Sequence, residues 1–203
     1  MMNKEKLFRY FGANLEESRT IRQISIDLGI PYMTLNRLMK DMEKRGLVTT
    51  KKVGKSIACS LNKGNEITKQ HMIIASESAK SDLAGKKPIL RKICEAMEEG
   101  KSREFSAALF GSYAAGNEQK RSDIDIAFVS NKKSIIKNIE DELKSIEQIH
   151  GIEINTMIFT EKQFIGMLEA KGENVGKQIL KNHVILHNPE MFWNIIYGVK
   201  NGI

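Results

Sequence analysis

Cysteine, proline and aromatic residues are scarce in this chain of 203 residues. It has two cysteines, three prolines and one tryptophan, and aromatic residues make up only 6% of it. Cys59 and Cys94 are far apart and fall in segments whose patterns predict a strand and a helix. We therefore expect neither a disulfide framework nor a metal site built from cysteines.

Long apolar runs are also absent. No stretch reaches the length that spans a membrane, and no signal peptide is recognisable at the start. We expect a cytoplasmic protein with no membrane partner. The chain has neither a Walker-type phosphate loop nor a dinucleotide-binding fingerprint, which argues against two large classes of nucleotide-binding enzyme.

Positive charge is unevenly distributed. Residues 1–65 hold 13 Lys and Arg against 6 Asp and Glu, a net charge of +7 that equals the formal charge of the whole chain. The other 138 residues hold 19 groups of each sign. A basic segment joined to a neutral one predicts a polyanionic partner for the basic segment alone.

The basic segment has a pattern of helices followed by a hairpin. Thr20 and Gln23 have the spacing of a capping box before an amphipathic helix over residues 21–28. Residues 29–31 predict a sharp corner, and a second helix follows over about residues 31–44. Its apolar spacing predicts that Leu35, Leu38 and Met42 are buried.

A hairpin is predicted next, from residues 47–53 and 56–61 with Gly54 at its tip. Lysines surround that tip, as expected for a loop that touches phosphates. The side chains that we expect at DNA are therefore Thr34, Asn36, Arg37 and Lys40 on the second helix and Lys51, Lys52 and Lys55 on the hairpin.

Residues 1–65 resemble the winged helix-turn-helix domains of transcription regulators. The resemblance depends mainly on residues 21–38 and on the Glu-Lys-Arg-Gly-Leu-Val run at 43–48. It implies binding to double-stranded DNA. The alternative is a winged helix used for protein contact or dimerisation, in which the lysines serve only solubility.

A different motif lies between Gly111 and Asp125, where a Gly-Ser pair is followed after ten residues by Asp-x-Asp. The apolar run before Gly111 predicts a buried strand that ends at a turn, where backbone N–H groups would face an anion. Asp123 and Asp125 alternate with isoleucines, so a strand would place both carboxylates on one face. Two such carboxylates can share hard divalent cations.

This motif resembles the minimal nucleotidyltransferases of the DNA polymerase β superfamily. Gly111, Ser112, Asp123 and Asp125 match that family's signature, and its third carboxylate falls on Glu153, in an alternating segment where Glu153 and Asn155 share one side. The alternative is that Ser-Asp forms an ordinary turn and that Glu153 lies on the wet face of an edge strand. The chain also has Ala115 where many relatives have Arg; Lys120 or Arg121 are the nearby replacements.

The resemblance implies two-metal catalysis. Asp123, Asp125 and Glu153 would be the catalytic residues and the ligands of two Mg²⁺ ions, while Gly111 and Ser112 would hold the phosphates of a nucleoside triphosphate, most simply ATP. The transferred group would be a nucleoside monophosphate.

The expected fold class is α+β, with a winged helix-turn-helix domain over residues 1–65 and a linker helix over 66–84. A polymerase β-like nucleotidyltransferase domain over 85–203 follows, with a small mixed sheet and flanking helices. The apolar residues 72–74 of the linker would pack across a homodimer or dock on the same chain.

The acceptor is not encoded in any motif. Small members of the family include adenylylating antitoxins that modify a HEPN-type RNase toxin, and others modify small molecules; an attached DNA-binding domain favours an antitoxin-like protein that represses its own promoter. The rival hypothesis is a non-enzymatic transcription regulator whose transferase-like domain only senses nucleotide.

Overall fold

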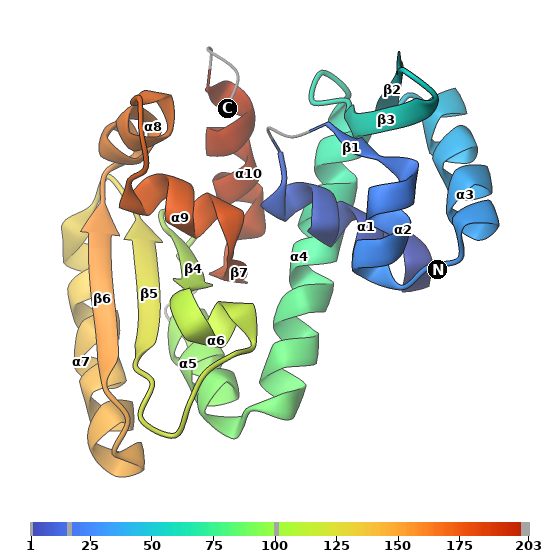
Figure 1. The fold of residues 1–203 in the computed structure, drawn as a ribbon. Coiled ribbons are helices and arrows are strands. Elements are labelled where there is room, and N and C mark those ends of the chain that lie inside the picture. Colours follow the sequence, from blue (N-terminus) through green and yellow to red (C-terminus); the bar gives the residue numbers. More distant parts are fainter. Residues whose placement is uncertain (1, 16–17, 100–101, 200–203) are drawn as a thin grey trace. The chain divides into compact units, whose positions relative to one another are not determined.

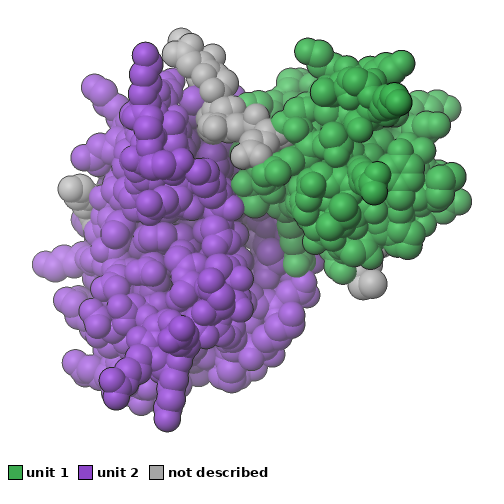
Figure 2. Space-filling model, viewed as in Figure 1, with its two compact units in different colours: residues 1–72 green, residues 73–203 purple. Residues whose placement is uncertain are grey.

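The computed structural model describes residues 2–15, 18–99 and 102–199. The chain divides into two compact units, Met1–Met72 and Ile73–Ile203 (Figure 2). No helix in the described ranges is long and apolar enough to cross a membrane.

The first unit combines helices with a small antiparallel sheet (Figure 1). Its sheet has the strand order β1-β3-β2, and β2 and β3 form a hairpin whose tip contains Gly54 at a φ of 58°. The elements are α1 (Met2–Ala13), β1 (Arg19–Thr20), α2 (Ile21–Leu28), α3 (Tyr32–Lys44), β2 (Val48–Val53) and β3 (Ser56–Leu61).

Helix α2 starts and ends at local signals in the sequence. The Thr20 side chain accepts a hydrogen bond from the backbone N–H of Gln23, which satisfies one free donor of the first turn. The Gln23 side chain donates to Asp27 at 2.7 Å, so it does not show the reciprocal half of a capping box. Gly29 ends the helix at a φ of 63°.

Helix α3 corrects one expected core position. It buries Leu35, Met39 and Met42, whereas Leu38 is only partly buried. The spacing i, i+4, i+7 centres the apolar stripe on the side of Met39, and Leu38 falls on its flank. The predicted burial of Leu38 is therefore wrong.

Helix α4 (Glu66–Lys86) contains the boundary between the two units. Lys87 separates it from α5 (Pro88–Glu99), whose proline occupies a first-turn position where no N–H is needed.

The second unit contains a four-stranded mixed sheet with the order β6-β5-β4-β7. β5 and β6 are parallel, and the other neighbouring strands are antiparallel. The remaining elements are β4 (Ser106–Phe110), α6 (Gly111–Ala115), β5 (Ile124–Val129), α7 (Lys133–His150), β6 (Ile154–Phe159), α8 (Glu161–Glu169), α9 (Val175–Lys181), β7 (Val184–His187) and α10 (Pro189–Gly198).

Helices cover both faces of this sheet (Figure 1). α5 and α7 pack on one face, in a core that includes Leu90, Leu109, Ile126 and Leu143. α9 and α10 pack against β4, and α8 against β6, from the other side. A small mixed sheet with flanking helices agrees with the expected α+β class for this part of the chain.

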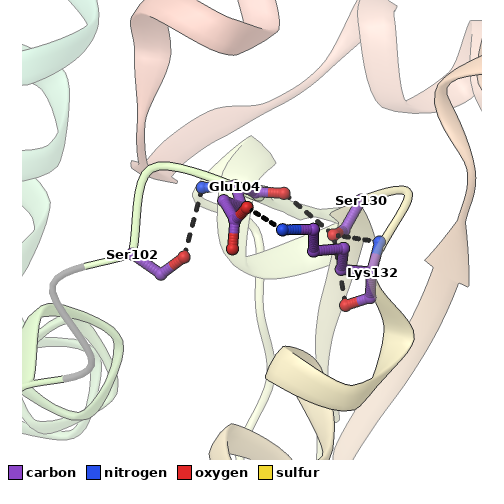
Figure 3. Close-up of polar contacts among 4 residues, drawn as sticks. All are labelled: Ser102, Glu104, Ser130 and Lys132. Atoms are coloured by element: carbon purple, nitrogen blue, oxygen red, sulfur yellow. Dashed lines mark hydrogen bonds and ion pairs between the residues drawn. The ribbon is translucent and has the colours of Figure 1, made fainter.

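A polar network fixes the ends of β4 and β5 that lie away from Asp125 (Figure 3). The buried Ser130 hydroxyl donates to the Glu104 carbonyl at 2.8 Å and accepts from the Lys132 backbone N–H at 3.0 Å, while Lys132 and Glu104 form an ion pair. The network satisfies the buried Ser130 hydroxyl and joins the segment before β4 to the segment after β5. The β4–β5 register pairs Phe110 with Asp125 at the other end.

Candidate active site

Asp123 and Asp125 lie at the start of β5. Asp123 immediately precedes the strand and is exposed, whereas Asp125 is its second residue and is partly buried. Ile124 and Ile126 between and after them are fully buried in the core. The alternation of β5 therefore directs the two isoleucines into one layer and leaves the carboxylates for the opposite face.

Gly111 lies directly against Asp125. It has a φ of 68°, in the left-handed region that side chains disfavour, and it turns the chain from β4 into α6. A Cβ atom at Gly111 would overlap the Oδ2 of Asp125 and lie 3.3 Å from its Cγ. Both the backbone conformation and the close approach therefore require glycine here.

Ser112 follows in α6 and is partly buried. Its carbonyl accepts from the N–H groups of Gly116 and Asn117, which closes the short helix. The loop then ends in a turn where the Ser122 hydroxyl accepts from the Gln119 N–H at 2.8 Å. The Gly-Ser pair and the Asp-x-Asp motif are thus brought together by one short helix and one turn.

Asn155 is the third side chain beside Asp123 and Asp125, and it was not among the residues predicted from the sequence. Asn155 is paired with Asp125 in the parallel β5–β6 register, so both side chains share a face. Its Nδ2 donates to Asp125 Oδ1 at 3.4 Å and to Asp123 Oδ2 at 3.5 Å. Asn155 could have been predicted from the alternation of this segment, which places Glu153 and Asn155 on one side of the strand.

Glu153 lies one residue before β6 and is exposed. Its backbone carbonyl accepts from the Ile124 N–H at 2.9 Å, which extends the strand pairing. Among the described residues, no group of three His, Cys, Asp or Glu side chains is arranged to hold a metal ion. The structure therefore brings Asp123 and Asp125 together with Asn155, and the parallel β5–β6 register places Glu153 next to Asp123 at the same end of the sheet.

The electrostatics at Asp125 favour a positive charge. Burial raises the pKa of its carboxyl above the usual value, and the neighbouring Asp123 raises it further, while the hydrogen bond from Asn155 lowers it. A cation between the two carboxylates would offset the burial and the repulsion together. The two carboxylates supply hard oxygen ligands, which suit Mg²⁺, so the residues present fit that ion.

The residues predicted at DNA lie in the first unit, and most are accessible. Arg37 and Lys40 are exposed on α3, as are Lys51, Lys52 and Lys55 around the hairpin tip. Thr34 and Asn36 are partly buried. In the part of the chain that the structure describes, the Asn36 Oδ1 is buried without a hydrogen-bond partner, so its oxygen does not face solvent.

Comparison with known proteins gives one match. Residues 90–187 match the family model of the nucleotidyltransferase domain, a range that holds all four strands of the second unit's sheet and Gly111, Ser112, Asp123, Asp125 and Asn155. No curated protein and no solved structure matches the chain. The expected similarity to nucleotidyltransferases is therefore confirmed over residues 90–187.

Proposed function

We propose that this chain is a DNA-binding nucleotidyltransferase that transfers a nucleoside monophosphate from a nucleoside triphosphate, most simply ATP, to a hydroxyl group. The observation that supports this most directly is the placement of the Asp125 carboxylate against the Gly111 turn, with Asp123 two residues before it, inside a range that matches the nucleotidyltransferase family.

Each part of the site would have one task. Asp123 and Asp125 would hold Mg²⁺ by their carboxylate oxygens, and Gly111 and Ser112 would bind the β- and γ-phosphates through backbone N–H groups and the hydroxyl. When bound, divalent cations neutralise phosphate charge and lower the pKa of a bound hydroxyl. The acceptor oxygen would bond to the α-phosphorus while its proton passes to water, and the bond between the α-phosphorus and the oxygen that bridges to the β-phosphate would break, so that pyrophosphate leaves.

DNA binding by the first unit is the second part of the proposal. The order of helices, the three-stranded sheet and the hairpin agree with a winged helix-turn-helix, and residues 1–65 carry the net charge of +7. α3 would enter the major groove with Arg37 and Lys40, and the hairpin lysines would contact phosphates. Tyr32 and Met33 at the start of α3 are 46% and 74% exposed, which adds apolar contact surface for base edges.

The proposal also includes a class of acceptor and a biological role. A protein that both binds DNA and modifies a hydroxyl fits a regulatory circuit, such as an antitoxin-like adenylyltransferase that represses its own promoter and modifies a HEPN-type toxin. A small-molecule hydroxyl is the other acceptor class. Homodimerisation would place two DNA-binding units on a palindromic site.

Asn155 favours a second candidate function. With an amide, and not a carboxylate, hydrogen-bonded to the aspartate pair, the domain would bind nucleotide and alter DNA affinity without transferring a group. In that case the protein is a nucleotide-sensing transcription regulator. The two functions differ in one observable, the covalent transfer of label.

The experiment is incubation of the full chain with each α-³²P-labelled nucleoside triphosphate, Mg²⁺ and purified products of neighbouring genes. Proposed transfer labels one acceptor and releases pyrophosphate, and the Asp125→Asn variant does neither. Retention of nucleotide without labelled acceptor or pyrophosphate, together with nucleotide-dependent DNA affinity, would favour the sensor.

A further inference from the structure

Asp123 and Asp125 are held in place by different parts of the chain. Asp125 is the second residue of β5, and its pairing with Phe110 and its contact with Gly111 set its position. Asp123 precedes the strand and is exposed, so its position depends on the loop that joins α6 to β5. The attachment of that loop therefore decides whether the two carboxylates can share one cation.

The loop over residues 116–122 is attached to the rest of its unit through Glu118. Glu118 and Ser122 are partly buried, and the other five residues of the loop are exposed. Ser122 closes a turn with Gln119 inside the loop, by hydrogen bonds of 2.8 Å and 3.0 Å. Glu118 instead forms an ion pair with Lys87, the residue between α4 and α5. Figure 1 shows the loop passing the corner between these two helices.

Lys87 has a well-defined position of its own. Its N–H donates to the Leu83 carbonyl at 3.0 Å, and its carbonyl accepts from the Leu90 N–H at 3.0 Å. Its ammonium lies 5.4 Å from the centroid of the Tyr113 ring, which is a cation–π contact with a buried residue of α6. Lys87 therefore contacts both α6 and the loop that follows it.

The ion pair is partly shielded from water. The side chains of Lys87 and Glu118 are 26% and 20% exposed. The second carboxylate oxygen of Glu118, Oε2, is buried and has no hydrogen-bond partner in the part of the chain that the structure describes. The Lys87 ammonium lowers the pKa of the Glu118 carboxyl, so the carboxylate is charged at neutral pH. Without Lys87, this charge would be more stable in water than at its present position, and the loop would lose its attachment.

We propose that Lys87 is a positioning residue of the candidate active site. By holding Glu118 it fixes the loop, and the fixed loop keeps the Asp123 carboxylate beside that of Asp125, where both bind one divalent cation. Helix α6 has no charged side chain, so the cation that orders this loop comes from the corner between α4 and α5. This inference rests on the proposed cation binding at the same site and adds the residue that orders it.

The test measures the affinity of the full chain for Mn²⁺ by electron paramagnetic resonance, with and without a non-hydrolysable ATP analogue. Lys87→Met has a similar length but no charge, and it weakens Mn²⁺ binding about tenfold because a misplaced ligand binds poorly. Glu118→Gln weakens it to a similar extent, and the double variant is no weaker than either single variant. The exchanged pair, Lys87→Glu with Glu118→Lys, restores the affinity to within about threefold of wild type.

A second ion pair on the same strands provides the matched control. Lys132 and Glu104 join the segments at the ends of β4 and β5 that lie away from Asp125 (Figure 3). Lys132→Met also breaks a lysine–glutamate pair of this unit, so it reports the effect of lost stability alone. It leaves the Mn²⁺ affinity within about twofold of wild type.

A double-mutant cycle tests whether Lys87 acts through Asp123. In a chain that already carries Asp123→Asn, Lys87→Met changes the Mn²⁺ affinity by at most about twofold, because the carboxylate that it positions is gone. A loss of about tenfold in that background would overturn the proposal, since the effect would then not pass through Asp123.

The remaining outcomes separate this inference from the proposed function. Wild-type Mn²⁺ affinity in Lys87→Met, or an equal loss in Lys87→Met and Lys132→Met, would overturn the positioning role and leave the proposed function intact. Glu118→Gln and the exchanged pair give the same decision if Lys87→Met does not fold. Wild-type protein that binds no Mn²⁺, with or without the analogue, would contradict the proposed function itself.

Discussion

At the scale of single residues, Gly111 lies directly against the candidate catalytic carboxylate of Asp125. Its positive φ and its contact with Asp125 each disfavour a side chain at this position. Another glycine of the chain has a positive φ but no such contact. Gly116 has a φ of 69°, and nothing lies within 4 Å of the position its Cβ would occupy.

Gly111→Ala and Gly116→Ala therefore separate the effect of backbone strain at a positive φ from the effect of contact with the Asp125 carboxylate. Each substitution costs about 1–2 kcal/mol of stability because alanine disfavours a positive φ. Only Gly111→Ala also displaces the Asp125 carboxylate, so it alone abolishes Mn²⁺ binding and transfer. Urea unfolding and Mn²⁺ titration of both variants check this, and equal Mn²⁺ affinity in the two variants would contradict it.

The aspartates themselves give a direct prediction. Asp123→Asn and Asp125→Asn each remove one charge with little change in volume, so transfer is abolished while the melting temperature stays near that of wild type. Asp141→Asn on the exposed face of α7 is the matched control and keeps full activity. Label transfer to the acceptor measures this, and undiminished transfer by both site variants would refute the assignment.

His183 predicts a pH dependence of stability. Its Nδ1 lies 3.1 Å from the Ile179 carbonyl and 3.0 Å from the Leu180 carbonyl, and its ring packs against Phe192 and Trp193. Burial lowers the pKa of this imidazole from 6.5 to about 4. The imidazole binds a proton more readily in the unfolded chain than in the folded one. The contribution of His183 to the free energy of unfolding is therefore at its maximum above pH 6.5. It decreases as the pH drops towards 4, by about 3 kcal/mol in total.

The His183→Asn variant tests this because its amide keeps a donor near the Nδ1 position but has no titrating ring. It is less stable than wild type at pH 7 because part of the ring's packing is lost, and its unfolding free energy changes less between pH 6.5 and 4. His150→Asn, at the exposed end of α7, controls for the change of residue type. Urea unfolding across this pH range would contradict the account if wild type and His183→Asn showed parallel curves.

At the scale of elements, the hairpin of β2 and β3 carries lysines that we propose contact the phosphates of DNA. Changing Lys51, Lys52 and Lys55 to alanine weakens binding of the full chain to duplex DNA at every sequence. It also reduces the salt slope of the binding constant by up to about three, because up to three fewer counterions are released. Fluorescence anisotropy at several salt concentrations measures both quantities.

A control of equal charge change comes from the second unit. Lys144, Lys162 and Lys171 are exposed on or beside its helices. Their triple alanine variant keeps the wild-type salt slope. If it lowered the slope as much as the hairpin variant does, DNA binding would not belong to the first unit.

Elements with strong local signals were predictable from the sequence. The helix behind Thr20 and the strands on either side of Gly54 have capping, alternation and turn residues that act within a few positions. The burial of Met39 rather than Leu38 was not predictable because a small rotation of α3 decides between flanking positions. Asn155 was missed for a related reason: alternation gives the face of a strand, but the register with β5 decides which residue lies beside Asp125.

At the scale of the whole molecule, the chain joins a basic unit to a unit whose residues 90–187 match the nucleotidyltransferase family. The central claim is that the second unit transfers a nucleoside monophosphate through Asp123 and Asp125.

The most direct test is Mg²⁺-dependent transfer of α-³²P label from ATP to a purified neighbouring gene product, compared between wild type and Asp125→Asn. The account predicts one labelled acceptor and stoichiometric pyrophosphate with wild type, and neither with the variant. Equal labelling by wild type and Asp125→Asn would contradict it, and so would wild-type protein that binds MgATP but releases no pyrophosphate with any protein or small hydroxyl acceptor supplied.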